Sequence, residues 1–373
     1  METKRRNDLD WIRILVFGLL IFYHIGMFFV SWGWHIKNNQ TFNSFEIPMM
    51  FVNQWRLPLL FVISGMGTYF ALSNKTFLSF FIERHNRLLI PLIFGMICIV
   101  APQVYVERLV SGATHDSFLG FYPHYFEGAY PNGNFSWHHL WFLPYLFVYS
   151  LILSPVFIYI RNNPECLFMR WTKSLFKKPL RLFFLLIPLL IPELILKPYF
   201  PVTHSLVKDW YTFTLYFILF FYGFIFISIG DLFGQAIQKL RKKSILIGLI
   251  TFSAFIILIY YGNNTLFVKT LYPFIIVLNM GVWIIAVLGF GSKYLNTRRN
   301  GALKYLNQAV YPLYILHQTI IVIVAYFIYN KDLNVGIKFA ILVIATIGIS
   351  FLIFEIVKRF WLTRILFGIK KIK

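Results

Sequence analysis

Apolar stretches of similar length recur along the chain and are separated by shorter polar segments. Ten of them approach the roughly 20 residues that a helix needs to cross a bilayer. They lie at about 11–32, 46–73, 88–106, 140–160, 181–197, 210–230, 244–261, 270–291, 309–329 and 336–357. Residues 107–137 form a longer segment, rich in aromatic residues and histidines, whose glycines and prolines argue against a regular helix throughout. The pattern predicts an all-α polytopic membrane protein, in which residues 1–373 form one domain of about ten helices with 107–137 as an external loop.

Composition supports this prediction. Hydrophobic residues make up 58% of the 373 residues and charged residues 13%, with a mean hydropathy of +0.68. A soluble domain carries about 25% charged residues, so the soluble classes are excluded. The two cysteines, Cys98 in an apolar run and Cys166 in a basic segment, do not suggest a disulfide framework. The first apolar stretch is too long for a cleavable signal and lacks a small-residue cleavage site.

The net charge of +21 is distributed unevenly among the junctions. Junctions after odd-numbered stretches carry few lysines and arginines, whereas the N-terminal KRR, residues 161–181, QKLRKK, TRRN and the KKIK tail are dense in them. The positive-inside rule therefore predicts that both termini are cytosolic. Basic segments of this kind lie beside anionic headgroups, so membrane lipid is the expected partner of this charge, and nucleic acid is not.

The first apolar stretch contains two residues whose side chains are energetically unfavourable in hydrocarbon. Arg13 lies near its N-terminal end and His24 at its middle. Eleven helical residues at about 100° each bring both to within roughly 20° of one face, about 16 Å apart along the axis. A charge in hydrocarbon costs at least a few kcal/mol, so the shared face suggests that both line one cavity. The alternatives are a histidine hydrogen-bonded between helices and an arginine whose head reaches the interface. Asp10 is suited to pair locally with Arg13.

Arginines recur in the next two segments. Arg56 lies about ten residues inside the second stretch, too deep to reach an interface. It either lines the cavity or holds loop carbonyls together. Arg84 and Arg87, just before the third stretch, are suited to flank an anionic ligand such as a nucleotide phosphate. A basic anchor at the membrane interface is the alternative for this pair.

A second deep histidine, His317, lies in YPLYILHQ of the ninth stretch, with Tyr314 near it. His24, Arg56 and His317 thus reach similar depth from three different stretches. Titratable groups that converge inside a bundle indicate either a transport pathway or a buried reaction site.

Aromatic and histidine side chains gather on the external side. Tyr125 lies in the long loop, and His139 and Trp141 begin the fourth stretch. Together with Tyr314 they are candidates for binding a sugar by stacking and hydrogen bonding. An aromatic belt at the membrane interface is the alternative.

Five segments occur in order: DWIR with a histidine eleven residues after its arginine, RLPLLFVISG, RHNRLLIP, HLWFL and YPLYILHQ. Together they resemble the membrane-bound acyltransferase family 3 over roughly residues 8–365, and within it the branch that succinylates periplasmic glucans. The resemblance implies transfer of an acyl group from cytosolic acyl-CoA, either acetyl-CoA or succinyl-CoA, to a hydroxyl of an extracytoplasmic glycan or glycolipid. It implies a bacterial inner-membrane enzyme whose partners are acyl-CoA and a carbohydrate acceptor, and no metal is expected.

The resemblance also implies roles for individual residues. The R-x10-H motif of the family corresponds to Arg13 and His24, with the histidine required for transfer. The R-x-x-R motif corresponds to Arg84 and Arg87, expected near the coenzyme A, and the arginine before the ISG turn corresponds to Arg56. Some relatives finish the transfer with a fused hydrolase-like domain that is not seen here. We therefore expect the reaction to be completed within the bundle or by a separate partner.

The chemistry of the reaction suggests how these residues act. A sugar hydroxyl has a pKa far above 7, and a buried neutral histidine such as His24 is suited to take its proton as general base. A transient acyl-histidine is the alternative route. Arg56 or His317 is placed to stabilise the developing oxyanion. Two other functions stay open: a transporter or flippase of a glycan or lipid precursor, and a scaffold in which His24 is dispensable.

Overall fold

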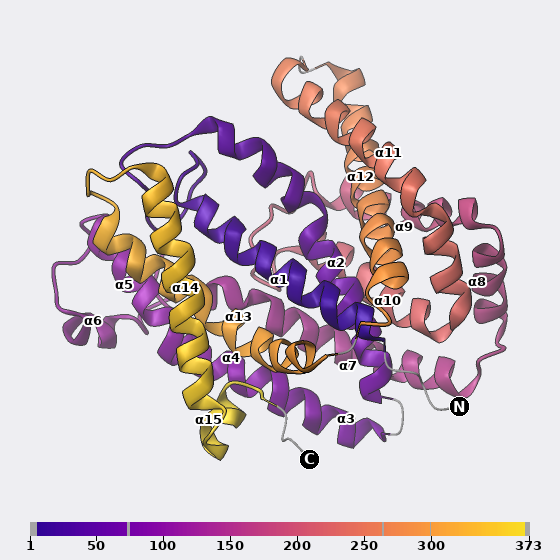
Figure 1. Cartoon of the computed structure of the whole chain (residues 1–373), viewed down its shortest axis with the longest axis horizontal. Coiled ribbons are helices and arrows are strands. Elements are labelled where there is room, and N and C mark those ends of the chain that lie inside the picture. The colour runs from indigo at the N-terminus through magenta and orange to yellow at the C-terminus, as the bar shows by residue number, and fades with distance from the viewer. Residues whose placement is uncertain (1–5, 73–74, 263–264, 299, 370–373) are drawn as a thin grey trace. The chain divides into compact units, whose positions relative to one another are not determined.

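A computed structural model describes residues 6–72, 75–262, 265–298 and 300–369 (Figure 1). Regular structure in these residues is helical, apart from one isolated bridge between Ala129 and Phe135. The α-helices are α1 (Asn7–Met27), α2 (Glu46–Leu72), α3 (Phe77–Arg84), α4 (Ile90–Phe94), α5 (Ala101–Val110), α6 (Phe118–His124), α7 (Phe142–Asn162), α8 (Leu167–Lys177), α9 (Ile187–Ile191), α10 (Trp210–Ser228), α11 (Asp231–Tyr261), α12 (Leu266–Tyr294), α13 (Gly301–Ile328), α14 (Val335–Val357) and α15 (Trp361–Leu366). Three 3-10 segments, η1 (Asn43–Phe45), η4 (His138–Trp141) and η5 (Pro179–Leu186), and three π segments, η2 (His85–Leu89), η3 (Gly95–Val100) and η6 (Pro192–Leu196), complete the order.

Ten helical stretches among the described residues are long and apolar enough to cross a membrane, which confirms the predicted all-α class with about ten spans. Several helices extend beyond the apolar stretches that indicated them. α11 begins at Asp231 and not near 244, and α13 begins at Gly301 and not near 309. Hydropathy falls at the first charged residues, whereas a helix continues past the interface because Lys and Arg heads reach water there. α1 ends at Met27 and not at 32, so His24 lies in its last turn and not at its middle.

The chain divides into two compact units. The first consists of Met1–Val16, Met50–Phe81 and Val148–Leu303, and therefore contains α8 to α12. The second consists of Phe17–Met49, Ile82–Phe147 and Lys304–Lys373, and contains α4 to α6, α14 and α15. The histidine contacts described below all lie within the second unit.

The backbones of α2 and α10 are in direct van der Waals contact in the first unit. A Cβ added to Gly65 would lie 1.9 Å from the carbonyl oxygen of Phe220, and one added to Gly223 would lie 1.9 Å from that of Val62. Van der Waals contact between helices is a main source of association in lipid, where water no longer drives apolar burial. Glycine at these two positions is therefore required by the close approach of the helices.

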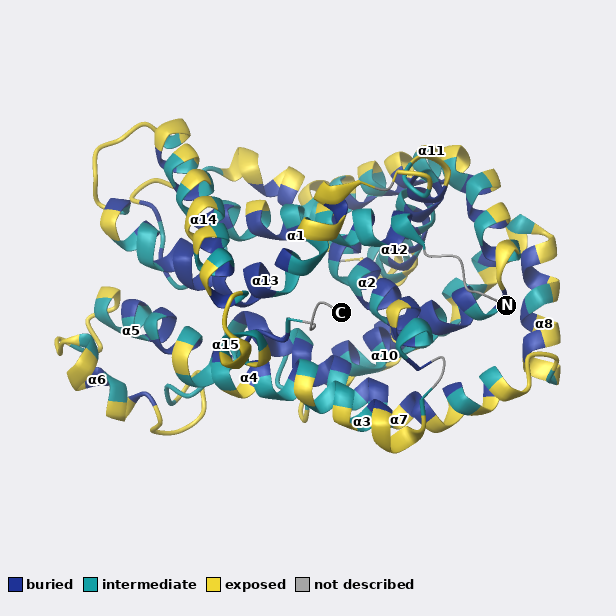
Figure 2. Ribbon diagram, turned by 60° about the horizontal axis from the view of Figure 1, so that its bottom comes forward, coloured by how far each residue is buried: buried dark blue, intermediate teal, exposed yellow. Residues whose placement is uncertain are grey.

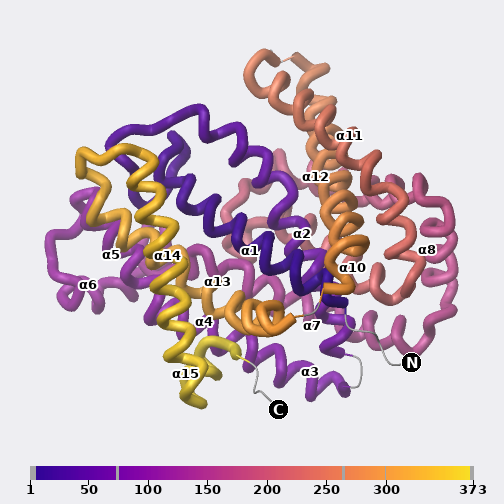
Figure 3. Tube along the Cα trace, in the orientation of Figure 1, coloured from indigo at the N-terminus to yellow at the C-terminus, as the bar shows by residue number. Residues whose placement is uncertain are grey.

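Large apolar side chains cover the outer faces of the helices in both units. Buried residues follow one side of most helices and exposed residues the other (Figure 2). α11, which runs beside α12 (Figures 1 and 3), exposes 62% of Leu246 and 61% of Ile250. In the second unit, α14 exposes 71% of Ile344 and 63% of Leu352. Apolar exposure on this scale is unfavourable in water and favourable in lipid, which agrees with membrane-spanning helices.

The helical stretch from Phe77 to Val110 is interrupted by the π segments η2 and η3. A π turn displaces backbone carbonyls from the regular hydrogen-bond ladder, and such turns often occur at functional sites. Three carbonyls of η3 accept side-chain hydroxyls. The pairs are Tyr125 to Met96 at 2.8 Å, Tyr122 to Ile97 at 3.2 Å and Thr319 to Ile99 at 2.7 Å. The widened turn therefore fastens both the 111–137 loop and α13 to this point of the second unit.

Candidate active site

The last turn of α1 and the middle of α13 bring two histidines into contact. His24 and His317 are 293 residues apart in the sequence, yet the Nδ1 of His24 lies 2.9 Å from the Nε2 of His317. Their rings lie edge to edge in nearly the same plane, with centroids 5.1 Å apart and an angle of 6° between the planes. The ring of Phe17 packs edge-on against His317, which has no exposed surface. Two of the three residues expected to be catalytic are therefore in direct contact.

Hydrogen bonds assign the tautomers of this pair. The Nδ1 of His317 lies 2.8 Å from the carbonyl oxygen of Tyr314, and because a carbonyl only accepts, His317 carries its proton on Nδ1. The Nε2 of a neutral His317 is then an acceptor, so His24 donates its Nδ1–H to it. This leaves the lone pair of His24 on Nε2. An imidazole held in this form has a basic nitrogen and a neighbour that stabilises the ring once it is protonated.

A third histidine, His139 in η4, packs against the His24–His317 pair. Its ring lies 5.2 Å from that of His317 at an angle of 89°. Its Nε2 donates to the carbonyl oxygen of Ile315 at 3.0 Å, and its own carbonyl oxygen accepts the hydroxyl of Tyr314 at 2.6 Å. His139 and Tyr314, both expected to bind substrate, are thus part of the packing that fixes His317.

Two buried amides extend this network. Gln103 donates from Nε2 to the Nδ1 of His139 at 3.3 Å and to the Thr319 hydroxyl at 2.6 Å. Its Oε1 accepts from Gln318 at 3.1 Å, and Gln318 also donates to the Nε2 of His35 at 2.9 Å. Gln103 and Gln318 were not singled out from the sequence. The available signal was a glutamine inside the apolar stretch 88–106 and another directly after His317, because an uncharged amide in a span also needs buried partners.

Arg87 lies at a separate pocket in the second unit. The pocket has a volume of about 240 Å³ and is lined by Asn86, Arg87, Ile90, Arg364, Ile365, Gly368 and Ile369. The carboxylate of Glu83 lies 3.8 Å from the guanidinium of Arg87 and 3.9 Å from that of Arg84. Tyr311 donates its hydroxyl to the backbone carbonyl of Arg87 at 2.6 Å and so fixes this turn of η2. The structure thus groups Arg87 with Arg364, whereas Arg84 is not among the residues that line the pocket.

Arg13 and Arg56 lie in the first unit, whereas the histidine pair lies in the second. Arg13 pairs with Asp10 at 3.3 Å, which confirms the local ion pair predicted from DWIR. Arg56 is buried, with 2% of its surface exposed. Arg56 was expected to lie too deep to reach an interface, and its side chain is indeed enclosed by the protein.

Tyr125 and Trp141, which were expected to bind the acceptor, are both buried. Tyr125 has no exposed surface, and its hydroxyl donates to the carbonyl oxygens of Met96 and Ser136 at 2.8 and 3.1 Å. Burial also raises the pKa of Tyr125, so the phenol remains a neutral donor. Trp141 packs edge-on against Tyr145, with ring centroids 5.2 Å apart. Both side chains thus have a packing role, and neither presents a face to a sugar in this arrangement.

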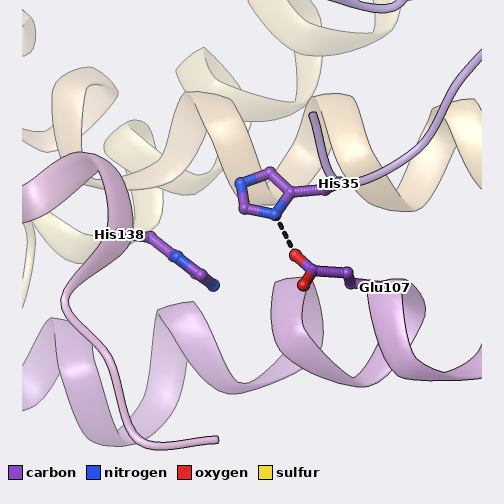
Figure 4. A group of neighbouring side chains, drawn as sticks. All are labelled: His35, Glu107 and His138. Carbon is purple, nitrogen blue, oxygen red and sulfur yellow. Dashed lines mark hydrogen bonds and ion pairs between the residues drawn. The ribbon is translucent and has the colours of Figure 1, made fainter. Parts of the chain in front are cut away.

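One group of side chains among the described residues has the composition of a metal site. His35, Glu107 and His138 each offer a ligand atom, and these atoms lie within 4.8 Å of one another (Figure 4). From the sequence no metal was expected, and the three residues are far apart in the chain. The group lies one hydrogen bond beyond Gln318, since His35 accepts from that amide.

The geometry can be compared with known families. The family described as "Acyltransferase domain" matches residues 6–355, almost the whole chain. The chain belongs to this family. Membership confirms the resemblance carried by the five ordered segments and makes the protein an acyltransferase.

Similar proteins in this family include three named "Glucans biosynthesis protein C". They come from Shigella dysenteriae serotype 1 (strain Sd197), Escherichia coli O81 (strain ED1a) and Escherichia coli (strain K12). Each is 24% identical over 385 residues, in an alignment that covers 100% of this acyltransferase and 96% of the relative. No solved structure matches.

Proposed function

We propose that this acyltransferase moves an acyl group from acyl-CoA to a hydroxyl of a glucan or a related glycan, with His24 as the general base. Family membership supports acyl transfer, and the names of the similar proteins support a glucan as acceptor. The observation that carries the proposal is the His24–His317 pair. It supplies a part-buried imidazole whose basic lone pair is assigned to Nε2 by hydrogen bonds that begin at the Tyr314 carbonyl.

The proposed reaction requires one proton to move twice. The acceptor hydroxyl gives its proton to the Nε2 of His24 while its oxygen attacks the thioester carbonyl. The tetrahedral intermediate then expels the CoA thiolate, and His24 returns the proton to that sulfur. The products are an ester and free CoA, and His24 is regenerated. An acyl-histidine formed on the same nitrogen is the alternative route, and it predicts an intermediate in the absence of acceptor.

His317 is best suited to an orienting role in this reaction. Its Nε2 accepts from His24, so a positive charge that develops on His24 is stabilised by a hydrogen bond that already exists. In this arrangement His317 does not donate to an oxyanion. Arg56 stays the candidate for that role on the ground of its sequence position alone.

The donor has phosphates, and the arginines supply a place for them. Arg87 and Arg364 face one pocket of about 240 Å³, and guanidinium groups bind phosphate with two parallel hydrogen bonds. We propose that this pocket holds a phosphate of acyl-CoA. Arg84 and Arg13 remain candidates for further phosphate contacts along the path of the pantetheine arm.

The expected membrane orientation agrees with donor phosphates that bind near Arg87 and a reaction that takes place at His24. Cytosolic termini in a bacterial inner membrane place the start of α1 and the turn at Arg87 on the cytosolic side, where acyl-CoA is made. His24 lies in the last turn of α1 and would then lie towards the external side. We infer that the donor enters from the cytosol and that the acceptor approaches from outside.

The proposal is tested with purified protein in detergent, radiolabelled acetyl-CoA or succinyl-CoA, and a glucan acceptor. We expect the label to enter the glucan, and we expect His24→Ala to lower the rate by about 100-fold or more, as loss of a general base does. His124→Ala is the matched control, because His124 is an exposed histidine of the same unit. A transporter or flippase does not need acyl-CoA. Folded protein that transfers no label from any acyl-CoA in a panel, or an unaffected His24→Ala variant, would overturn the proposal.

A further inference from the structure

The His35–Glu107–His138 group joins three separate segments of the second unit. His35 lies in the segment after α1, Glu107 in the last turns of α5, and His138 is the first residue of η4. The Nδ1 of His35 lies 2.5 Å from the Oε2 of Glu107, and the rings of His35 and His138 have centroids 4.5 Å apart. Both rings and the carboxylate face one small space (Figure 4). The side chains are largely enclosed, with 10% of His35 and 17% of Glu107 exposed.

His138 is held towards this space by a strained backbone. Its φ of 37° lies in the left-handed region, which a residue with a Cβ rarely adopts without support from its surroundings. The Ser136 hydroxyl supplies part of this support, because it accepts the His138 backbone N–H at 3.0 Å and lies 3.4 Å from Nδ1. The Nε2 of His138 is buried and has no hydrogen-bond partner among the described residues. An imidazole nitrogen that is removed from water without a partner is unfavourable unless a ligand uses it.

The neighbouring cation does not neutralise Glu107. The closest approach of Arg108 to that carboxylate is 4.0 Å. Its guanidinium donates instead to the loop, to Asn134 Oδ1 at 2.9 Å and to the carbonyl oxygens of Pro131 and Gly133 at 3.0 and 2.9 Å. The polar contacts of the Glu107 carboxylate are instead with His35, at 2.5 Å, and with the hydroxyl of Tyr130, so the carboxylate stays at the space between the two histidines.

We propose that His35, Glu107 and His138 bind a divalent transition-metal ion, and that Zn²⁺ is the ion they suit best. Two imidazole nitrogens and one carboxylate are a donor set that Zn²⁺ accepts, with a fourth position left for water or another oxygen. Ligand atoms around a tetrahedral Zn²⁺ lie about 3.4 Å apart, given bonds of about 2.1 Å. The present separations run from 2.5 Å to at most 4.8 Å, so they bracket that value and shifts of about 1 Å bring the atoms into place.

Metal binding has a consequence for the buried amides. An ion on the Nδ1 of His35 replaces the proton now shared with Glu107, and a neutral His35 then carries its proton on Nε2. Gln318 must present its amide oxygen, and no longer its nitrogen, to that proton. Gln318 thereby acts as the outer partner that orients a metal-bound histidine. The same amide contacts Gln103 and, through it, His139. The metal site and the histidine that packs against the His24–His317 pair therefore share one hydrogen-bond network.

The ion also has a mechanical effect on the second unit. It would tie the segment after α1 to α5 and to the start of η4, three segments whose other contacts here are hydrogen bonds and ring packing. Ions that bind only the folded state stabilise it in proportion to their occupancy. We therefore infer a structural role for the ion, independent of which acyl donor or acceptor the enzyme uses.

The test measures metal content and not transfer activity, so it stands apart from the proposed function. Full-length protein without a histidine tag is purified in detergent, stripped with EDTA, dialysed against buffered Zn²⁺, and analysed by inductively coupled plasma mass spectrometry. We expect about one Zn²⁺ per chain in the wild type, and a rise in melting temperature when Zn²⁺ is returned to stripped protein. Replacement by Co²⁺ should give visible absorption bands, because its d electrons report coordination by nitrogen and oxygen.

Three variants make the test specific. His138→Gly removes a ligand and relieves the strain at a φ of 37°, so it should fold and lose both the Zn²⁺ and the melting shift. Glu107→Gln also removes a ligand, so it should likewise fold and lose both the Zn²⁺ and the melting shift. His124→Ala is the matched control, because it removes a histidine that pairs with Glu127 at 2.8 Å on the exposed surface of the same loop, and it should keep the metal. Gln318→Ala should bind Zn²⁺ about 10-fold more weakly, as loss of an outer partner does.

Two results would overturn the proposal. One is a wild-type protein that takes up no more Zn²⁺, Co²⁺, Mn²⁺ or Fe²⁺ than His138→Gly. The other is uptake that persists in both His138→Gly and Glu107→Gln, because the ion then lies elsewhere.

Discussion

The role of His317 can be separated from that of His24 by two substitutions at one position. In His317→Gln the amide oxygen can occupy the place of Nε2 and continue to accept from the Nδ1–H of His24. In His317→Leu that acceptor is removed while the side chain remains of similar volume. The ring contacts with Phe17 and His139 change in both variants, so the pair of substitutions isolates the acceptor.

The size of each effect follows from the hydrogen bonds. A hydrogen bond to a charged group contributes about 1.5–3 kcal/mol, and the bond from His24 becomes one when His24 is protonated in the reaction. The neutral bond that exists before the reaction contributes about 0.5–1.5 kcal/mol, so the gain in the transition state is about 1–1.5 kcal/mol. Its loss in His317→Leu should therefore lower kcat by about 5- to 12-fold, at about 1.4 kcal/mol for each factor of ten. His317→Gln keeps this bond and loses the bond to Tyr314, which is neutral both before and during the reaction, so the variant should melt at a lower temperature and keep kcat within about 2-fold.

The assay is acyl transfer from labelled acyl-CoA at saturating glucan, with melting temperature and detergent gel filtration as controls for folding. The decrease should appear in kcat, with the KM for acyl-CoA unchanged, because the donor phosphates are expected to bind elsewhere. Equal losses in the Gln and Leu variants would refute the reasoning and indicate that His317 itself takes a proton or the acyl group. A larger loss in Gln than in Leu would refute it as well.

Three further predictions concern other parts of the molecule. Arg87→Ala and Arg364→Ala should each raise the KM for acyl-CoA by about 10- to 100-fold, since each removes a charge-assisted hydrogen bond to phosphate, and an unchanged KM in both would reject the pocket. Gly65→Ala should prevent stable folding, because its Cβ would lie 1.9 Å from a carbonyl oxygen, whereas Gly67→Ala has open space and should melt like the wild type. Burial lowers the pKa of Lys37 to about 8, an effect that Glu46 partly offsets. The folded state then binds fewer protons than the unfolded state between pH 8 and 10.5, so the contribution of Lys37 to stability should rise across that range and stay constant at its lower level below pH 8. Melting temperatures of Lys37→Met should lack this rise.

Local patterns in the sequence were sufficient to predict the class of fold. A helix in lipid satisfies its backbone hydrogen bonds internally, so each span has to be one continuous apolar stretch that can be seen in the sequence. The same locality explains why the Asp10–Arg13 pair was predicted, since residues three apart lie on one face of a helix. Helix ends were less well predicted, because charged residues lower the hydropathy before the helix stops, as they do ahead of α11 and α13.

Individual candidates within the site were visible in the sequence, but their partners were decided by tertiary structure. His24 and His317 stood out because a titratable group in an apolar stretch is rare, yet nothing local states that their nitrogens meet across 293 residues. Gln103 and Gln318 carry no charge and so gave a weaker signal, although they connect His139 to His35. The His35–Glu107–His138 group depends on three segments that are brought together by packing. Hydropathy is a property of neighbours along the chain, whereas a hydrogen bond or a metal site depends on atoms that meet only when distant helices pack.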